Sequence, residues 1–430
     1  MEIHLIFTKN NKLKLSISNN SNQHGNFKIC FSLVYSIQDI DGGKISKKVG
    51  RYYEIFSEQD EIIFTLQKPR IGSYNLSCGP EGLFIIGKND EKLECKINVL
   101  NFEDPIPEII YSNDQEKIFD PVIPVPFFSK LKQETIQIKN LEFKISSSEK
   151  IFFENFNNFV KASDIKFSTS IGYPIVFIKK NLETDEYKIL IDKKLITIHY
   201  SDYGGKFYSI ITLIQLINFY KSKLLLGLIE DKPSLSWRGM HLDCARQFYS
   251  IDEIKRLMDY MCFFKLNRFH WHLTDNEAWR VELESYPKLT KIGSFRGYNE
   301  KIPPFYGTGY NKTGGYYSRS QIKELTEYAK QRNIQIMPEI DLPAHSWTLL
   351  QVMPELRDPS SNITSEDVGN YPNNTINPAI EETQVFLKNI LEELSEIFSF
   401  NIIHVGVDER PKESWEGSPK VIEYMKKNNI

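Results

Sequence analysis

The chain contains 430 residues, more than one ordinary domain needs, so its length predicts two or three domains. Hydrophobic residues make up 41% and charged residues 25% of the chain, which excludes a largely disordered or fibrous protein. The formal net charge of -3 provides no long-range attraction for the phosphates of nucleic acid or for an anionic membrane. We therefore expect neither nucleic acid nor a membrane as a partner, and a neutral polymer or small glycan fits the charge better.

The first 20 residues contain no apolar run of signal-peptide length. Nowhere in the chain do about 18 apolar residues follow one another, as a membrane-spanning helix requires. The sequence as written predicts a cytoplasmic protein by default, and its localisation is otherwise unknown. The cysteines lack CxxC spacing, which predicts neither a disulfide framework nor a cysteine zinc site, and no cofactor is expected.

Three regions precede the last part of the chain. Residues 1–104 alternate short β-type runs with turns and predict a small β-sandwich, which either binds carbohydrate or packs against the next domain. Prolines punctuate residues 105–121, which we interpret as a linker. Residues 122–232 predict an α+β domain, with a hairpin over 187–200 and an amphipathic helix over 207–219.

From residue 233 to residue 430 the pattern is strand, loop and helix, repeated. Alternating strands and helices predict parallel βα units, hence α/β structure in a (β/α) TIM-type barrel or a doubly wound sheet. The predicted strands are 238–243, 268–273, 335–340 and 402–407, and the predicted helices are 251–264, 319–331 and 379–398. The helix starts are marked by Ser250 with Glu253, Ser318 with Gln321, and Asn377 with Pro378.

The region 233–430 contains only four βα units, whereas a closed barrel has eight strands in about 250 residues. We therefore expect only about half of a barrel, with open sheet edges and an interior exposed to water. A second chain that completes the barrel is a candidate partner.

Polar side chains follow each predicted strand where the chain leaves the sheet. They are Asp243 with Arg246, Asp275, Asp341 with His345, and Asp408 with Glu409. Because the carboxyl ends of parallel strands meet at one edge, we expect one convergent polar site. Asp408 and Glu409 can reach one pocket there, and repulsion with partial burial is expected to raise the pKa of at least one carboxyl group. That group is then a general acid, and the alternative is a solvated loop pair.

Four motifs occur in order: Trp237-Arg238-Gly239 with Asp243 and Arg246, then HWHLTD at 270–275, PEIDLPAH at 338–345 and HVGVDE at 404–409. In this order and spacing they resemble the family 20 glycoside hydrolases, the β-N-acetylhexosaminidases, and the resemblance runs from about residue 122 to the end. It implies release of terminal N-acetylglucosamine or N-acetylgalactosamine from glycans or chitooligosaccharides. Which of the two sugars is preferred is left open.

The resemblance also implies a substrate-assisted, retaining mechanism, in which the 2-acetamido oxygen of the substrate attacks the anomeric carbon. Glu409 is then the general acid and afterwards the base, and Asp408 orients the acetamido group. Asp275 and His345 form a buried chain with Glu409 that tunes its proton affinity.

Three further residues are candidates for binding the sugar, each with a structural alternative. By the resemblance Arg238 holds sugar hydroxyls, and the alternative is an ion pair at the barrel rim. Glu339 bonds to the substrate or supports His345. Trp279 stacks on a sugar face or lies in the core.

Other interpretations stay open. A metal-dependent, amidohydrolase-like barrel would use His270, His272, His345, His404 and Asp408 as ligands, and Asp243 with Arg246 is expected to form a structural ion pair. The later strands of the family carry the aromatic residues that wall the acetamido pocket, and Val407 stands where the family usually has a glycine. An inactive or weakly active fragment, or a carbohydrate-binding protein, is therefore an alternative function.

Overall fold

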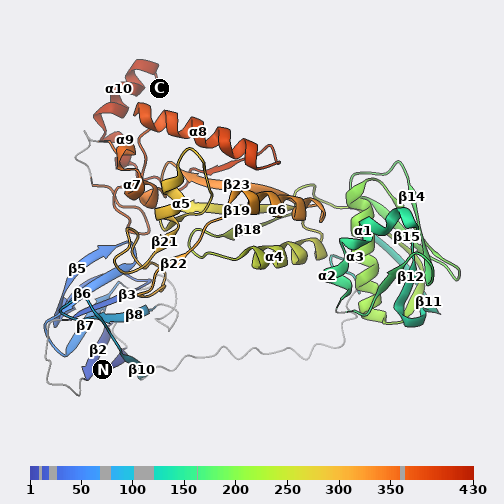
Figure 1. The fold of residues 1–430 in the computed structure, drawn as a ribbon, viewed down its shortest axis with the longest axis horizontal. Helices are drawn as coiled ribbons and strands as arrows, with labels where there is room; N and C mark the ends of the chain where they lie inside the picture. The colour runs from blue at the N-terminus through green and yellow to red at the C-terminus, as the bar shows by residue number, and fades with distance from the viewer. Residues whose placement is uncertain (9–11, 19–26, 68–78, 101–120, 162, 359–363) are drawn as a thin grey trace.

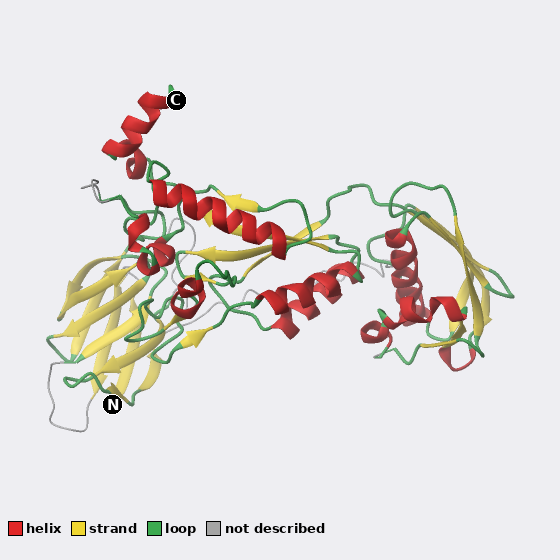
Figure 2. Cartoon of the chain, turned by 45° about the horizontal axis from the view of Figure 1, so that its top comes forward, coloured by secondary structure: helices red, strands yellow, loops and turns green. Residues whose placement is uncertain are grey.

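The structure is a computed structural model that describes residues 1–8, 12–18, 27–67, 79–100, 121–161, 163–358 and 364–430. The predicted linker, 105–121, lies outside the described residues except for Pro121. Three bodies follow one another across the molecule, with a β-rich body at one end, a parallel sheet with helices in the middle and an α+β body at the other end (Figures 1 and 2). Within the described ranges, no helix is long and apolar enough to cross a membrane.

The first body contains two five-stranded sheets, in the orders β10-β1-β2-β7-β4 and β5-β6-β3-β8-β9. Along β2 buried and accessible side chains alternate, so one face of its sheet is apolar. Leu13 and Leu15 of β2 share one buried cluster with Ile29 and Phe31 of β3, which joins the two sheets face to face as in a β-sandwich. The strands are β1 (Glu2–Thr8), β2 (Lys12–Ser18), β3 (Lys28–Ser32), β4 (Ile37–Asp41), β5 (Gly43–Val49), β6 (Tyr52–Ser57), β7 (Glu61–Leu66), β8 (Glu81–Ile86), β9 (Lys92–Leu93) and β10 (Lys96–Leu100).

Among the described residues, the sandwich packs against the middle body, and no buried cluster joins it to the α+β body that follows it in the chain. Tyr52 and Phe84 of the sandwich belong to one buried cluster with Phe305, Trp347 and Tyr371 of the middle body. We expected the sandwich either to bind carbohydrate or to pack against the next domain in the chain. It does pack, but against the middle body, because loops of that body supply the matching aromatic side chains. Carbohydrate binding by the sandwich stays a prediction.

The α+β body is one seven-stranded sheet in the order β11-β17-β15-β16-β14-β12-β13. The predicted hairpin is confirmed, because β15 and β16 pair antiparallel over five residues each. The predicted helix is present as α3, but it is not amphipathic as expected, because every side chain from Phe207 to Ile217 is buried between the sheet and the middle body. Asp202 caps its first turn by accepting the N–H of Gly205. The elements are β11 (Phe128–Gln137), β12 (Glu142–Lys144), α1 (Lys150–Glu154), α2 (Asn157–Val160), β13 (Lys166–Ser168), β14 (Tyr173–Lys179), β15 (Tyr187–Ile191), β16 (Ile196–Tyr200), α3 (Tyr203–Tyr220) and β17 (Lys223–Asp231).

The middle body is built on four parallel strands, β18 (Gly239–Asp243), β19 (Arg268–Asp275), β23 (Gln335–Leu342) and β24 (His404–Gly406). All four overlap the predicted strands. They are neighbours in chain order, as in a (β/α) barrel, whereas a doubly wound sheet reverses its order. Among the described residues the sheet is open, because β18 and β24 each pair with only one other strand.

Three long helices follow the strands of this body, and two begin as predicted. Ser250 and Ser318 form capping boxes with Glu253 and Gln321 at the starts of α4 (Ile251–Phe263) and α6 (Arg319–Lys330). The third, α8 (Glu381–Ile397), begins past Pro378, because Asn377 accepts the N–H of Ala379 and forms a turn there. The shorter elements are β20 (Ala278–Trp279), α5 (Pro287–Gly293), β21 (Phe295–Arg296), β22 (Thr313–Gly314), α7 (Trp347–Val352), α9 (Glu413–Glu416) and α10 (Pro419–Asn428).

Candidate active site

The carboxyl ends of β19, β23 and β24 bring four of the predicted residues together. Asp275 is the last residue of β19, His345 follows β23, and Asp408 and Glu409 follow β24. His345 Nδ1 lies 2.9 Å from Asp275 Oδ1. His345 Nε2 lies 3.3 Å from Glu409 Oε2 and 3.7 Å from Asp408 Oδ2. His345 is therefore hydrogen-bonded to a buried carboxylate and lies next to the two accessible ones, with which its Nε2 makes contacts but no hydrogen bond of good geometry.

Asp275 is the buried anchor of this group, with a side chain only 1% exposed. Its carboxylate contacts Arg246 Nη2 at 2.6 Å and His272 Nε2 at 2.9 Å, and accepts the backbone N–H of Asn276 at 2.6 Å. Burial would raise the pKa of Asp275, but the hydrogen bonds from His272 and His345 and the charge of Arg246 hold it below its ordinary value. Asp275 is therefore an anion that three cationic partners surround.

Two neighbouring groups hold protons near neutral pH. Burial opposes a charge on His345, but the hydrogen bond and charge of Asp275 outweigh it and raise the pKa of His345 to about 9. Burial raises the pKa of Asp341 to about 8 against the charge of His345, and the carboxylates of Asp275 and Asp408 add to that rise.

The Asp408 and Glu409 side chains are 58% and 46% exposed, which is more open than the partial burial we expected. The reason is the position of β24, which pairs only with β23 among the described strands. The two interpretations, a solvated pair and a convergent site, are compatible, because both carboxylates are open to solvent and both lie next to His345.

The backbone at the site is left-handed at several positions. Residues His345, Gly406, Val407 and Glu409 have φ values of 51°, 66°, 78° and 50°. Only glycine fits at 406, because a Cβ there would lie 1.9 Å from Asp341 Oδ1. Such clusters of unfavourable φ values are typical of functional sites, where they aim side chains that a regular strand end would misdirect.

The middle body matches known proteins. Residues 235–430 match the model of the glycosyl hydrolase family 20 catalytic domain. Over 255 residues the chain is 38% identical to a β-hexosaminidase of Vibrio furnissii, covering 58% of this chain and 42% of that protein. It is 32% identical over 250 residues to the N,N'-diacetylchitobiase of Vibrio harveyi, covering 52% of this chain and 28% of that protein. Residues 235–430 belong to glycoside hydrolase family 20.

A solved structure of a family 20 exo-β-N-acetylglucosaminidase from Vibrio harveyi, in complex with N-acetylglucosamine, is similar to the whole chain. The TM-score is 0.86 at 26% identity, over 100% of this chain and 71% of that chain. The family 20 domain is thus of TIM-barrel type and follows an N-terminal domain, as predicted, although its described strands form an open sheet. The chain spans less than half the length of the two curated relatives named above.

The family 20 domain carries a β-branched residue in a left-handed conformation at Val407, which is 65% exposed. Replacing Val407 with glycine removes that strain, which exceeds the entropy cost of a glycine, so we expect a gain of about 1 kcal/mol in the free energy of unfolding. Urea denaturation measures it. As a matched control, Val405→Gly on β24 should lose about 1 kcal/mol, because Val405 has ordinary strand geometry. Equal effects of the two substitutions would contradict the strain argument.

Arg238 does not lie with the carboxylate site, so its binding of sugar hydroxyls stays a prediction. Arg238 precedes β18 and so lies at the amino end of the family 20 sheet, opposite the site. Its Nη2 lies 3.1 Å from Asp185 of the α+β body, and its Nε donates to the carbonyl oxygen of Lys265 at 2.8 Å. The alternative of an ion pair at the rim is what the structure contains.

Glu339 and Trp279 are also engaged by the protein. Trp279 is 1% exposed, and its indole N–H donates to the carbonyl oxygen of Val281 at 2.8 Å, so it lies in the core with no face open to a sugar. Glu339 is 5% exposed and does not contact His345, because imidazoles of other strands surround its carboxylate. Burial would raise the pKa of Glu339, but its close contacts with those imidazoles hold it below its ordinary value.

The five ligands of the metal-dependent alternative do not converge on one point among the described residues. His345 and Asp408 lie together at the strand ends, whereas His270, His272 and His404 contact Glu339. The separation follows from strand register, because His272 and Glu339 are cross-strand partners and His345 lies beyond the end of β23.

Two residues of the site had been given no catalytic or binding role from the sequence. Arg246 pairs with Asp243 at 2.9 Å, as expected, but it also contacts Asp275 and lies 2.8 Å from Glu277. Glu277 is buried and accepts a hydrogen bond from Tyr371 at 2.8 Å, and burial raises its pKa to about 7. The position of Arg246 just past the carboxyl end of a strand was the available signal, whereas nothing local marks Glu277.

Proposed function

We propose that the chain is a β-N-acetylhexosaminidase that removes terminal N-acetylglucosamine or N-acetylgalactosamine from the non-reducing ends of glycans or chitooligosaccharides. The observation that carries the proposal is the line Glu409–His345–Asp275 beside Asp408, at the carboxyl ends of the strands of a family 20 domain. The curated relatives are named β-hexosaminidase and chitobiase, which supports the same substrate class.

In this proposal Glu409 donates its proton to the leaving oxygen and later accepts one from water. Asp408 holds the N–H of the 2-acetamido group, whose oxygen attacks the anomeric carbon, so no enzyme nucleophile is needed. His345 and Asp275 are positioning residues: His345 Nε2 lies 3.3 Å from Glu409 Oε2, and Asp275 holds the imidazole in place through its Nδ1.

We also propose the division into a β-rich domain at 1–104, a linker at 105–121, an α+β domain at 122–232 and one half of the barrel at 233–430. Among the described residues, each β-sheet contains strands from only one of these regions, which supports the division. The open edges of β18 and β24, with Ile402 and Val405 each at least 40% exposed, support a half barrel. Further strands, such as those of a second chain, would then complete the pocket.

The accessible Asp408 and Glu409 side chains favour a second candidate, a protein that binds the sugar with little or no turnover. Water at both carboxylates weakens the electrostatic effects on which hydrolysis depends. This second candidate binds the same sugar as the proposed hydrolase and differs from it only in the rate of hydrolysis.

One assay tests the proposal. The purified chain should release phenol from an aryl N-acetyl-β-glucosaminide and not from the matching aryl β-glucoside, which lacks the acetamido group. A stable thiazoline analogue of the oxazoline intermediate should bind at the same site. Binding without release would favour the second candidate. A chain that does neither, or that cleaves both substrates equally, would contradict the hexosaminidase proposal.

A further inference from the structure

Four imidazoles surround the single carboxylate of Glu339, on the face of the parallel sheet that does not pack against helices. Phe269 and Trp271 of β19 are buried in the helix-covered core, so the alternating residues His270 and His272 lie on the other face. In a barrel that face is the interior, which is usually filled by bulky apolar side chains. Here it carries groups that bind cations.

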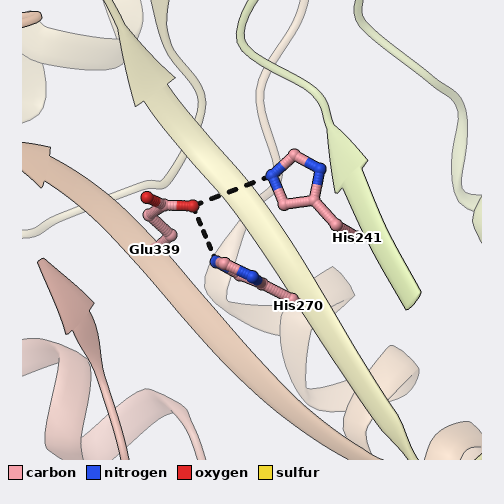
Figure 3. A group of neighbouring side chains, drawn as sticks. All are labelled: His241, His270 and Glu339. Atoms are coloured by element: carbon pink, nitrogen blue, oxygen red, sulfur yellow. Dashed lines mark ion pairs between the residues drawn. The ribbon is translucent and has the colours of Figure 1, made fainter. Parts of the chain in front are cut away.

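Three ligand atoms converge within this cluster (Figure 3). His270 Nε2 lies 2.7 Å and His241 Nε2 lies 3.8 Å from the same oxygen, Oε2 of Glu339. The ligand atoms of the three residues all lie within 4.8 Å of one another. They come from three neighbouring strands, in which His241 and His270 are direct cross-strand partners, so the sheet itself holds them together.

The contact between His270 and Glu339 is close but is not a good hydrogen bond. Nε2 of His270 is buried, and among the described residues it has no partner with hydrogen-bond geometry, although the carboxylate oxygen is 2.7 Å away. A buried imidazole nitrogen in this state costs free energy unless another group satisfies it. A metal ion accepts the lone pair of that nitrogen and the carboxylate at the same time.

We propose that His241, His270 and Glu339 bind one divalent transition-metal ion, and that zinc is the ion this ligand set suits. Two imidazoles and one carboxylate form a common zinc ligand set that leaves the fourth position open. Tetrahedral bonds of about 2.0–2.1 Å place ligand atoms about 3.3 Å apart. The observed separations from Glu339 Oε2, 2.7 Å and 3.8 Å, lie on either side of that value, so small side-chain rotations suffice.

Access and charge also suit the ion. The His241 side chain is 50% exposed, so the ion and a water ligand can reach the site from solvent. The carboxylate of Glu339 supplies the negative charge that favours a bound cation, and its Oε2 also lies 2.8 Å from His272 Nδ1. The ion would sit apart from Glu409, so the site is separate from the proposed acid and base chemistry and does not depend on it.

Zinc titration of the full chain tests the proposal. After removal of metals with a chelator, calorimetric titration with zinc chloride should reach one ion per chain. His241→Ala and His270→Ala should each weaken zinc binding by at least about tenfold, whereas His199→Ala, on β16 of the other sheet, should leave it unchanged. Because His241 is half exposed, its removal should preserve the fold, and circular dichroism checks this.

Two further readouts decide the location. Zinc should raise the thermal unfolding midpoint of the parent chain but not that of His241→Ala. Cobalt in place of zinc should give the visible absorption bands of a four-coordinate site, lost in Glu339→Gln. No saturation up to about 100 µM zinc, or binding unchanged by both histidine variants, would overturn the proposal. So would zinc binding that His345→Gln abolishes and His241→Ala leaves intact, because the ion would then lie at the acidic pair.

Discussion

Glu409→Gln is expected to lower kcat/KM for an aryl N-acetyl-β-glucosaminide with a poor leaving group by about a thousandfold, because no proton is then delivered to the leaving oxygen. Glutamine keeps the size of the side chain, so the fold and the binding of a thiazoline analogue should be preserved. With a dinitrophenyl leaving group, which departs as an anion, the loss in the first step should be much smaller.

Asp408→Asn is the matched control for this prediction. It removes the negative charge that holds the acetamido group, so its loss of activity should be about a hundredfold or more with either leaving group. Glu409 and Asp408 are neighbours and similarly exposed, so the two variants differ only in role. Activity that survives in Asp408→Asn would rule out substrate assistance. A loss in Glu409→Gln that is the same for both leaving groups would show that Glu409 is not the general acid.

Asp275→Asn is expected to lower the free energy of unfolding by about 3 to 5 kcal/mol. The substitution leaves Arg246, His272 and His345 converging on a neutral amide, with a side chain that is only 1% exposed. Urea denaturation measures the loss. Asp243→Asn is the control, because Asp243 contacts the same arginine at 30% exposure and should cost about 1 kcal/mol. Equal losses would show that burial of Asp275 does not matter.

The pH dependence of the free energy of unfolding shows how much of the effect of Asp275→Asn comes from charge and how much from packing. The pKa of His345 is raised in the folded chain to about 9 from an ordinary value of 6.5. Its stabilising contribution is therefore complete below about pH 6.5 and is lost as the pH rises through about 9. In Asp275→Asn the raised pKa of His345 loses its main cause, so stability should fall less between about pH 7 and about pH 9 than in the parent chain.

Local patterns in the sequence were sufficient to predict the strands that are followed by polar side chains. The alternation of strands and helices predicts parallel pairing, and parallel strands have their carboxyl ends at one edge. Asp275, His345, Asp408 and Glu409 each follow a strand and therefore meet there. The capping boxes at Ser250 and Ser318 are local as well, because their partners lie three residues away.

The roles of Arg238, Glu339 and Trp279 depended on neighbours that are distant in the chain. Arg238 lies at the amino end of its strand and finds Asp185 of another body, a contact between residues 53 apart. Trp279 is covered by the core of the domain, and its exposure is not encoded by the residues next to it. The partner of the sandwich was likewise decided by loops that lie more than 200 residues away.

By itself the sequence determined the parallel βα units, the edge of the sheet at which polar residues gather and the family whose motifs they resemble, because each depends on short-range spacing. Only the tertiary structure decided that Asp275 is a buried anion held by three cations, that Val407 is left-handed and that four imidazoles surround Glu339. The physical reason is that burial, backbone strain and side-chain convergence are set by contacts across strands, whose register no single segment specifies.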